Sequence, residues 1–215
     1  MTHPPVVLFD FDGTIADTHT VFVQIINRLA DEFGYEPASP EKVKQMQGLT
    51  AQNIIRQSGI SVFKIPLLLR RLKRELHQEM KQVQTIAGMD DAIRQLHTQG
   101  YQLGIVTSNW IENVRLFLEL QALTDCFIWT YSSSTLFGKH RMLNRFIKQS
   151  GLNSQCIVYV GDESRDIEAA QASGIDIISV AWGFNAPELL AAYKPTALIT
   201  EAQELLPTVQ RLFNT

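Results

Sequence analysis

Cysteine is scarce in this sequence, with only Cys126 and Cys156 among 215 residues. Each of the two stands at the start of an apolar run, which predicts buried, reduced thiols rather than a disulfide framework. A chain without disulfides is typical of a reducing compartment. Charge of one sign is not in excess either, because the formal net charge is −3. The composition therefore gives no indication of nucleic acid or an anionic membrane as a partner.

Long hydrophobic runs are also missing. No apolar run approaches the roughly 18 residues that a membrane-spanning helix needs. The apolar stretch before Asp10 is too short for a secretory signal peptide. There is no internal repeat and no low-complexity tract. We therefore expect a cytoplasmic protein, either a monomer or a homodimer, whose chain is long enough to bury a sizeable core without disulfides.

The sequence does contain a repeated alternation of strand-like and helix-like segments. The strand-like runs are nearly continuous in apolar residues, which is typical of strands covered on both faces in a parallel sheet. They span residues 6–11, 101–108, 126–131, 156–161, 175–182 and 197–200. The helix-like stretches span about 88–99, 110–121, 141–150, 164–173, 186–193 and 201–213. This order predicts an α/β fold with a doubly wound, mainly parallel, Rossmann-like sheet.

Residues 18–83 interrupt the alternation, because they show helical patterns and no convincing strand. Gly34 is a typical stop signal after a first helix. Ser39 and Thr50 are typical capping residues of two further helices, and a last helix is expected over 66–83. We expect an all-helical insertion that lies over the sheet. The expected division is a catalytic core, 1–17 and 84–215, and a helical cap domain, 18–83.

Two aspartates follow the first predicted strand, in the string D-F-D-G-T that begins at Asp10. Residues two apart in an extended chain face the same side, so Asp10 and Asp12 can point at one ligand. Gly13 allows the backbone to turn sharply there. Ligands of open α/β sheets bind outside the carboxyl ends of the strands. A bare pair of this kind is also compatible with turn-forming aspartates, so its meaning depends on the other strand ends.

Those other strand ends carry polar groups as well. The string T-S-N at 107–109 follows one predicted strand, and G-D-E-S-R-D at 161–166 follows another, with its two aspartates about one helical turn apart. Lys139 precedes a helix between them. A lone lysine is usually a solvated surface residue, so the information lies in the order of the motifs along the chain.

This order closely resembles that of the haloacid-dehalogenase-like hydrolases, over essentially the whole chain. The helical insertion resembles the cap of their phosphoglycolate phosphatase-like branch, and the strings D-F-D-G-T and G-D-E-S-R-D are quite specific to the superfamily. The resemblance implies that Asp10 is the nucleophile and Asp12 the general acid and base, and that Asp10, Asp12 and Asp162 bind Mg²⁺. It implies that phosphate is bound by Thr107, Ser108, Asn109 and Lys139, with Lys139 as the cation that also steadies the nucleophile. Asp166 and Glu163 would be supporting residues.

One position departs from the pattern of the family. Many relatives have a proline after the lysine, where this chain has His140. The departure bears on the conformation of the loop around Lys139. The nearest other candidate, Lys148, lies well inside the predicted helix, so Lys139 remains the expected active-site lysine.

Formal charge supports a bound cation at this site. Four aspartates and one lysine leave three negative charges, which would repel a phosphate dianion. Mg²⁺ would leave one negative charge, and a proton on Asp12 would leave none. A hard cation suits oxygen ligands, and the absence of nearby cysteine or paired histidine argues against zinc. We expect Mg²⁺ to be bound by Asp10, Asp162 and the backbone carbonyl of Asp12.

The aspartate at position 12 separates reaction classes. Family members that dehalogenate lack an aspartate at the matching position, since a halide leaving group needs no proton. Asp12 therefore favours phosphoryl transfer, in which a carboxylate such as Asp10 forms an aspartyl-phosphate. We expect a phosphatase that hydrolyses small phosphate monoesters, because a cap limits access to small phosphorylated metabolites. Two alternatives stay open: a phosphomutase acting on a sugar phosphate, and a non-catalytic protein that binds a phosphorylated ligand on the same fold.

Overall fold

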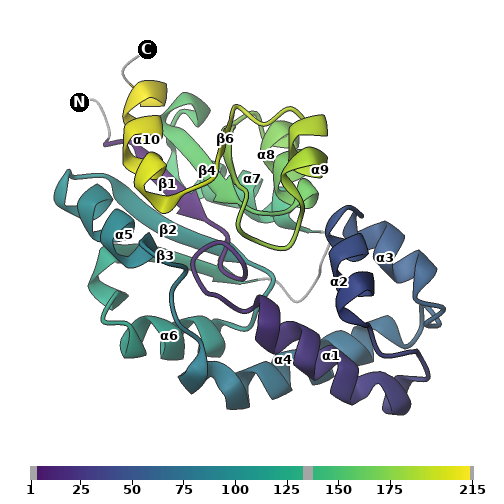
Figure 1. The fold of residues 1–215 in the computed structure, drawn as a ribbon. Coiled ribbons are helices and arrows are strands. Elements are labelled where there is room, and N and C mark those ends of the chain that lie inside the picture. Colours follow the sequence, from purple (N-terminus) through teal and green to yellow (C-terminus); the bar gives the residue numbers. More distant parts are fainter. Residues whose placement is uncertain (1–3, 133–137, 214–215) are drawn as a thin grey trace.

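The computed structural model describes residues 4–132 and 138–213. Within this part of the chain, six parallel strands form one sheet in the order β3-β2-β1-β4-β5-β6 (Figure 1). The strands are β1 (Val6–Phe9), β2 (Gln102–Thr107), β3 (Phe127–Ser132), β4 (Ile157–Gly161), β5 (Asp176–Val180) and β6 (Ala197–Ile199). The predicted doubly wound, parallel α/β fold is confirmed, and the first strand lies in the middle of the sheet.

Helices cover both faces of this sheet. Alternate residues of each strand point to opposite sides, and the apolar side chains on both sides need to be buried. Val7 and Phe9 of β1 belong to one apolar cluster, and Val6 and Leu8 belong to the other. The first cluster includes side chains of α5 (Met89–Thr98), α6 (Ile111–Leu120) and α10 (Leu205–Phe213). The second includes side chains of α7 (Lys139–Ser150), α8 (Ser164–Ala172) and α9 (Pro187–Ala192). Burial on both faces explains why the strand sequences are apolar throughout.

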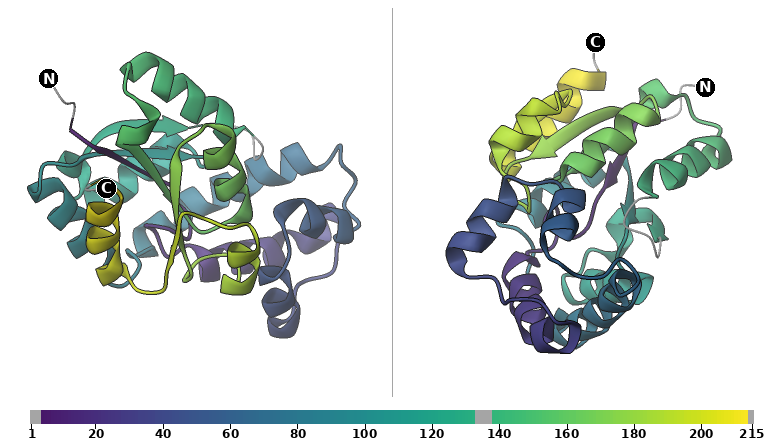
Figure 2. Two further views of the ribbon diagram at one scale, coloured as in Figure 1. Left: turned by 90° about the horizontal axis from the view of Figure 1, so that it is seen from above. Right: turned by 90° about the vertical axis from the view of Figure 1, so that its right-hand side faces the viewer.

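Four helices lie between β1 and α5, and we call them the cap: α1 (His19–Phe33), α2 (Pro40–Gln47), α3 (Ala51–Gln57) and α4 (Ile65–Glu79). Figure 2 shows them gathered at one end of the molecule. Gly34 ends α1 with a φ of 75°, a conformation that glycine adopts without strain. Ser39 and Thr50 accept hydrogen bonds from the third residue after each, as the capping pattern predicts. Helices α1 and α4 pack through Ile25 and Leu72 in the larger apolar cluster.

The chain enters and leaves the cap side by side. The Asp17 amide donates to the Gln84 carbonyl at 2.9 Å, and Ala16 pairs with Thr85 in an isolated antiparallel bridge. The two chain segments that connect the cap to the sheet, at Ala16–Asp17 and Gln84–Thr85, are therefore paired with each other. The division into a core and a cap domain at residues 18 and 83 remains a prediction.

Several element ends differ from the prediction by a few residues. The first strand ends at Phe9 rather than residue 11, because the amides of Ile15 and Ala16 donate to the Phe11 carbonyl and close a turn there. The helix expected over 66–83 ends at Glu79, and a short 3₁₀ segment, Met80–Gln82, follows it. Other 3₁₀ segments are Thr124–Cys126, Ser154–Cys156 and Ala202–Glu204.

Both cysteines are free thiols, as expected. Cys126 is buried, but Cys156 is only partly buried, so the expectation of full burial was wrong for Cys156. It ends the 3₁₀ segment before β4 rather than standing inside the strand. Among the described residues, the helices are too short or too polar for any of them to cross a membrane.

Candidate active site

The strand ends bring the predicted residues to one edge of the sheet. Asp10 directly follows β1, Thr107 ends β2, and Asp162 directly follows β4. Lys139 is the first residue of α7 and Asp166 lies in the first turn of α8. The side chains of all five are almost fully buried. The helix expected from residue 141 begins at Lys139 instead, which seats this lysine at the carboxyl edge.

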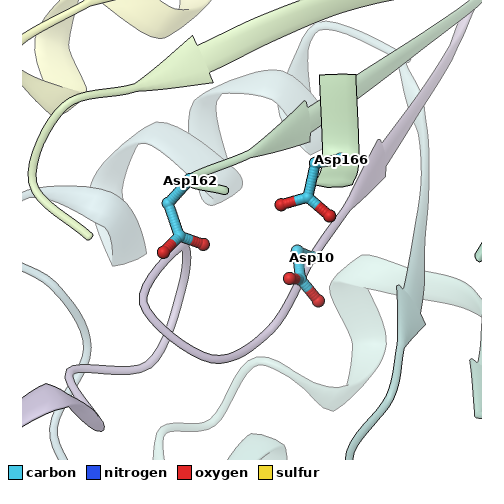
Figure 3. A group of neighbouring side chains, drawn as sticks. All are labelled: Asp10, Asp162 and Asp166. Carbon is cyan, nitrogen blue, oxygen red and sulfur yellow. The ribbon is translucent and has the colours of Figure 1, made fainter. Parts of the chain in front are cut away.

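Three of these aspartates form one cluster. Asp10, Asp162 and Asp166 each have a carboxylate oxygen within 4.8 Å of those of the other two. Figure 3 shows the three side chains converging from the end of β1, the end of β4 and the start of α8. Oxygen donors in a buried group of this kind are suited to a hard divalent cation. The donor set therefore fits a metal ion.

Lys139 provides a positive charge to the same cluster. Its ammonium lies 2.7 Å from Asp10 Oδ2 and also forms an ion pair with Asp166. Burial lowers the pKa of Lys139, but the carboxylates of Asp10 and Asp166 raise it more, so the amine stays charged. Lys148, the other candidate, is exposed on the far part of α7. The contacts place Lys139, and not Lys148, beside the proposed nucleophile.

The carboxylate of Asp162 is held by two hydrogen bonds. Thr14 Oγ1 donates to its Oδ1 at 2.7 Å, and the Phe184 amide donates to its Oδ2 at 2.7 Å. Two glycines make room for this arrangement. A Cβ added at Gly13 would lie 2.5 Å from Asp162 Oδ2, and one added at Gly183 would lie 2.2 Å from it. The D-F-D-G-T turn and the loop after β5 therefore both close on Asp162.

Asp12 takes part in a different set of contacts. Its two carboxylate oxygens accept hydrogen bonds from Asn109 Nδ2, both at 3.0 Å. Asn109 Oδ1 accepts in turn from Asn113 Nδ2 at 2.9 Å. Asn113 is fully buried on α6, and it also contacts the cap: its Nδ2 donates to the Lys73 carbonyl at 3.2 Å and its Oδ1 lies 2.7 Å from His77 Nδ1. A chain of side-chain amides thus joins α4 to Asp12.

Three carboxyl groups of the site, those of Asp12, Asp162 and Asp166, have raised pKa values. Burial is the largest cause for each of them, and neighbouring carboxylates add to it. The pKa of Asp12 is raised to about 7 by burial and by Asp10, and Asn109 partly opposes the shift. Burial raises the pKa of Asp166 to about 6, against the lowering effect of Lys139, and raises that of Asp162 well above 3.8. A bound cation would relieve this repulsion.

A cavity of about 650 Å³ lies between this edge of the sheet and the cap. Its core side includes Asp12, Ser108 and Asn109, and its cap side is mostly apolar. Leu49, in the turn between α2 and α3, also lines it. Asn185 joins the two sides, because its Nδ2 donates to the Leu49 carbonyl at 3.2 Å while its Oδ1 accepts from the Ser164 amide.

The structure brings together most of the predicted residues but separates their carboxylates into two groups. The Asp12 side chain faces Asn109, whereas the acidic cluster includes Asp166. Metal binding through the Asp12 backbone carbonyl remains a prediction. Thr107 Oγ1 accepts from the Asn109 amide at 3.0 Å, which leaves its hydroxyl proton for a ligand. Glu163 supports the site as the capping residue of α8, where its amide donates to Asp166.

Sequence reasoning missed Asn113 and Lys73. Asn113 had a signal, because it stands four residues before Phe117 and so lies on the apolar face of its helix. A fully buried polar side chain on such a face indicates a specific partner. Lys73 stands in a run of basic residues with Arg70, Arg71 and Arg74. Such a run is typical of a solvated helix face and is also compatible with attraction of anionic substrates, so it does not single out Lys73.

Comparison with known proteins agrees with this geometry. The model of the family described as "Haloacid dehalogenase-like hydrolase" matches residues 7–180. A phosphoglycolate phosphatase from Synechococcus elongatus is 34% identical over 206 residues, which cover 96% of this chain and 97% of that protein. A pyrophosphatase from Bacillus mycoides is 25% identical, with 96% of this chain and 97% of that protein covered.

Solved structures share the fold at lower sequence identity. The crystal structure described as a predicted phosphatase from Clostridium acetobutylicum has a TM-score of 0.84 at 16% identity, and covers 98% of this chain and 100% of that one. A haloacid dehalogenase-like protein from Streptococcus pneumoniae has a TM-score of 0.80 at 19% identity, with 96% and 99% covered. With the family model spanning most of its length and a relative aligned end to end, the chain belongs to the haloacid dehalogenase-like hydrolases.

Proposed function

We propose that the protein is a Mg²⁺-dependent phosphatase of small phosphate monoesters, with Asp10 as its nucleophile. One observation carries the proposal. The Asp10 carboxylate lies 2.7 Å from the Lys139 ammonium and belongs to the same acidic cluster as Asp162 and Asp166. A lysine and a divalent cation beside one carboxylate would neutralise it and hold a phosphate dianion against it.

In the first step, a carboxylate oxygen of Asp10 attacks phosphorus while the bond from phosphorus to the ester oxygen breaks. Lys139 and the Thr107 hydroxyl stabilise the negative charge on the phosphoryl oxygens. The Asp12 carboxyl donates its proton to the departing alkoxide. Its pKa of about 7 lets a sizeable share of the group be protonated at neutral pH. The products of this step are an aspartyl-phosphate on Asp10 and the free alcohol.

In the second step, water attacks the phosphorus of the aspartyl-phosphate. Asp12, now a carboxylate, takes a proton from that water, and the bond from Asp10 to phosphorus breaks. The Asp10 carboxylate is restored and inorganic phosphate leaves. Asn109 fixes the direction of the Asp12 carboxylate through both of its oxygens, so one group serves as acid and then as base.

Mg²⁺ fits the donor set better than a softer metal does. The acidic cluster offers only carboxylate oxygens among the described residues, and Mg²⁺ typically takes one or two carboxylates, several waters and a phosphate oxygen. Asp10 and Asp162 would hold it, with the Asp12 carbonyl as the expected third protein ligand. When bound, the ion supplies positive charge that offsets repulsion between the carboxylates and the phosphate dianion.

Phosphoglycolate is the first substrate to test. The relative from Synechococcus elongatus that aligns over 97% of its length carries the name of that activity. The pyrophosphatase from Bacillus mycoides makes pyrophosphate the second.

The test is phosphate release from a panel of small phosphate monoesters, with Mg²⁺ or with EDTA, by the wild type and by Asp10→Asn. We expect release to need Mg²⁺ and to fall by about 10³-fold or more in Asp10→Asn, because the variant lacks the attacking carboxylate. Asp31→Asn is the matched control, since Asp31 is exposed on α1 away from the cluster. Near-normal turnover by Asp10→Asn would show that the mechanism is wrong.

A further inference from the structure

The cavity beneath the cap begins at the group that protonates the leaving oxygen. Its walls include Asp12, Ser108 and Asn109 but, among the described residues, not Asp10, Thr107 or Lys139. The expected nucleophile and lysine are therefore not part of the cavity wall, whereas Ser108 and Asn109, two of the expected phosphate-binding residues, are. The part of a substrate beyond its ester oxygen would extend from Asp12 into the cap.

The cap side of this cavity is largely hydrocarbon, with Phe22, Ile26, Ile54 and Leu72 among its walls. Its cations differ in their surroundings. Arg165 forms an ion pair with Glu163, and Lys42 is exposed at the rim. Lys73 is only partly exposed, and its own backbone carbonyl accepts the hydrogen bond by which Asn113 joins α4 to the core.

Lys73 is the cation with unused binding capacity. In residues 4–132 and 138–213, the structure gives its ammonium no hydrogen bond and no ion pair. Burial lowers its pKa, Asp12 raises it and Arg165 lowers it further, so its charge interacts with groups on the core side of the cavity. A partly desolvated ammonium without a counter-ion is costly, and an anionic ligand group would offset that cost.

We propose that Lys73 binds a second anionic group on the leaving part of the substrate, and so selects carboxylated or phosphorylated leaving groups over neutral ones. The proposal rests on the phosphatase function proposed above. The phosphate ester sits at Asp10, its ester oxygen at Asp12, and the second anion at Lys73 across the cavity. The apolar walls around Lys73 strengthen that contact, since they exclude water from it.

The test uses substrates that differ only in the second charge. Phosphoglycolate and ethyl phosphate both have a two-carbon leaving group, and pyrophosphate offers a phosphate in place of the carboxylate. In Lys73→Met we expect KM to rise about tenfold or more for phosphoglycolate, for pyrophosphate or for both, because a charge-assisted contact is lost. For ethyl phosphate we expect kcat/KM within about twofold of the wild type. The substrate whose KM rises in Lys73→Met shows whether Lys73 binds a carboxylate, a phosphate or both.

Two further variants separate recognition from other effects. Lys73→Arg retains the charge and should restore much of the lost affinity. Arg74→Met removes a charge from the exposed side of the same helix and should leave the ratio between phosphoglycolate and ethyl phosphate unchanged. An equal loss on all substrates in Lys73→Met, or no loss on any, would overturn the proposal. If the wild type shows no Asp10-dependent turnover of any substrate, the proposed function itself fails.

Discussion

Two aspartates two residues apart acquire different properties from their neighbours. Asp10 contacts the Lys139 ammonium, whereas Asp12 is held by a neutral amide, Asn109. Lysine stabilises the charged carboxylate that a nucleophile needs. Burial beside another carboxylate favours the protonated form that a general acid needs, and it raises the pKa of Asp12 to about 7. The division of roles proposed for Asp10 and Asp12 thus rests on their contacts rather than on the D-x-D spacing.

The raised pKa of Asp12 predicts a pH-dependent cost to stability. Its folded value of about 7 exceeds the ordinary 3.8, so the folded state binds this proton more tightly than the unfolded state. Stability is therefore lost as the pH rises from about 4 to about 7, and the whole cost is present above that range. In EDTA, urea unfolding should show Asp12→Asn to be more stable than the wild type at pH about 8 and equal to it near pH 4. A gain that does not change with pH would contradict this.

We predict that position 183 must be glycine, because there is no room for a side chain beside Asp162. A methyl group there would overlap the Asp162 carboxylate, whose Cβ would lie only 2.3 Å away. We expect Gly183→Ala to raise the Mg²⁺ concentration needed for half-maximal activity by about 10- to 100-fold, as for other residues that orient a metal ligand. Gly48→Ala is the control, since its methyl would meet the Gln45 carbonyl at an ordinary 3.5 Å. Equal Mg²⁺ dependence in both variants would refute the prediction.

The residues that could be read from the sequence are those at the ends of strands. Asp10 and Asp162 follow apolar runs, and the parallel sheet brings such ends together. Asn113 and Lys73 could not be assigned, because their meaning comes from the packing of α4 against α6. Helical periodicity gives the faces of each helix but not which two helices meet.

At the scale of elements, α4 and α6 form a connection between the cap and Asp12, the proposed general acid. Asn113 stands at its centre, with His77 and the Lys73 carbonyl on the cap side and Asn109 on the core side. Each contact fixes the orientation of the next amide. The position of α4 therefore bears on the direction in which Asn109 presents its Nδ2 to Asp12.

Removal of this central amide should affect both stability and catalysis. Asn113→Leu removes the contacts of this amide with Asn109, the Lys73 carbonyl and His77, so we expect a loss of about 1–3 kcal/mol in the free energy of unfolding. The Trp110 amide still donates to Asn109 Oδ1 at 2.7 Å, so Asn109 loses one of its two donors. We also expect a lower kcat, because Asp12 loses its fixed direction. Urea unfolding and steady-state kinetics measure the two effects. Glu119→Leu, on the exposed side of α6, should change stability by less than about 0.5 kcal/mol. An active Asn113→Leu enzyme with normal kcat would show that the connection does not reach Asp12.

For the whole molecule, the sheet and a helical cap over it were predictable, but the packing of the cap helices was not. Continuous apolar strands such as β4 fix burial on both faces, and their alternation with helices gives the parallel topology. The cap carries no comparable pattern, since its helices show only that each has one apolar side. The cavity of about 650 Å³ depends on how α1 and α4 pack above the edge of the sheet. That packing is set by contacts between helices, which the sequence pattern of each helix does not specify.

A cap over the site predicts selection by size. Asn185 and the Ala186 amide both bond to the α2–α3 segment, at Leu49 and Gln47, so the described structure leaves the site covered. A phosphoserine on a folded protein would not reach Asp10 beneath this cover. We expect kcat/KM for a phosphoprotein to be at least about 100-fold below that for phosphoglycolate, measured by phosphate release. Faster turnover of the phosphoprotein would contradict this, and a phosphorylated tripeptide provides the intermediate case.

The pairing of the two connecting segments at Ala16 and Thr85 bears on the evolution and engineering of this enzyme. Everything between them leaves the middle strand and returns to the same place, so the intervening sequence can be exchanged without altering the order of the strands. If the cap selects the leaving group as proposed, bond cleavage and most of the choice of substrate are encoded in separate stretches of the gene. Random variation confined to the inserted stretch should yield new specificities at a far higher rate than variation spread over the whole coding sequence.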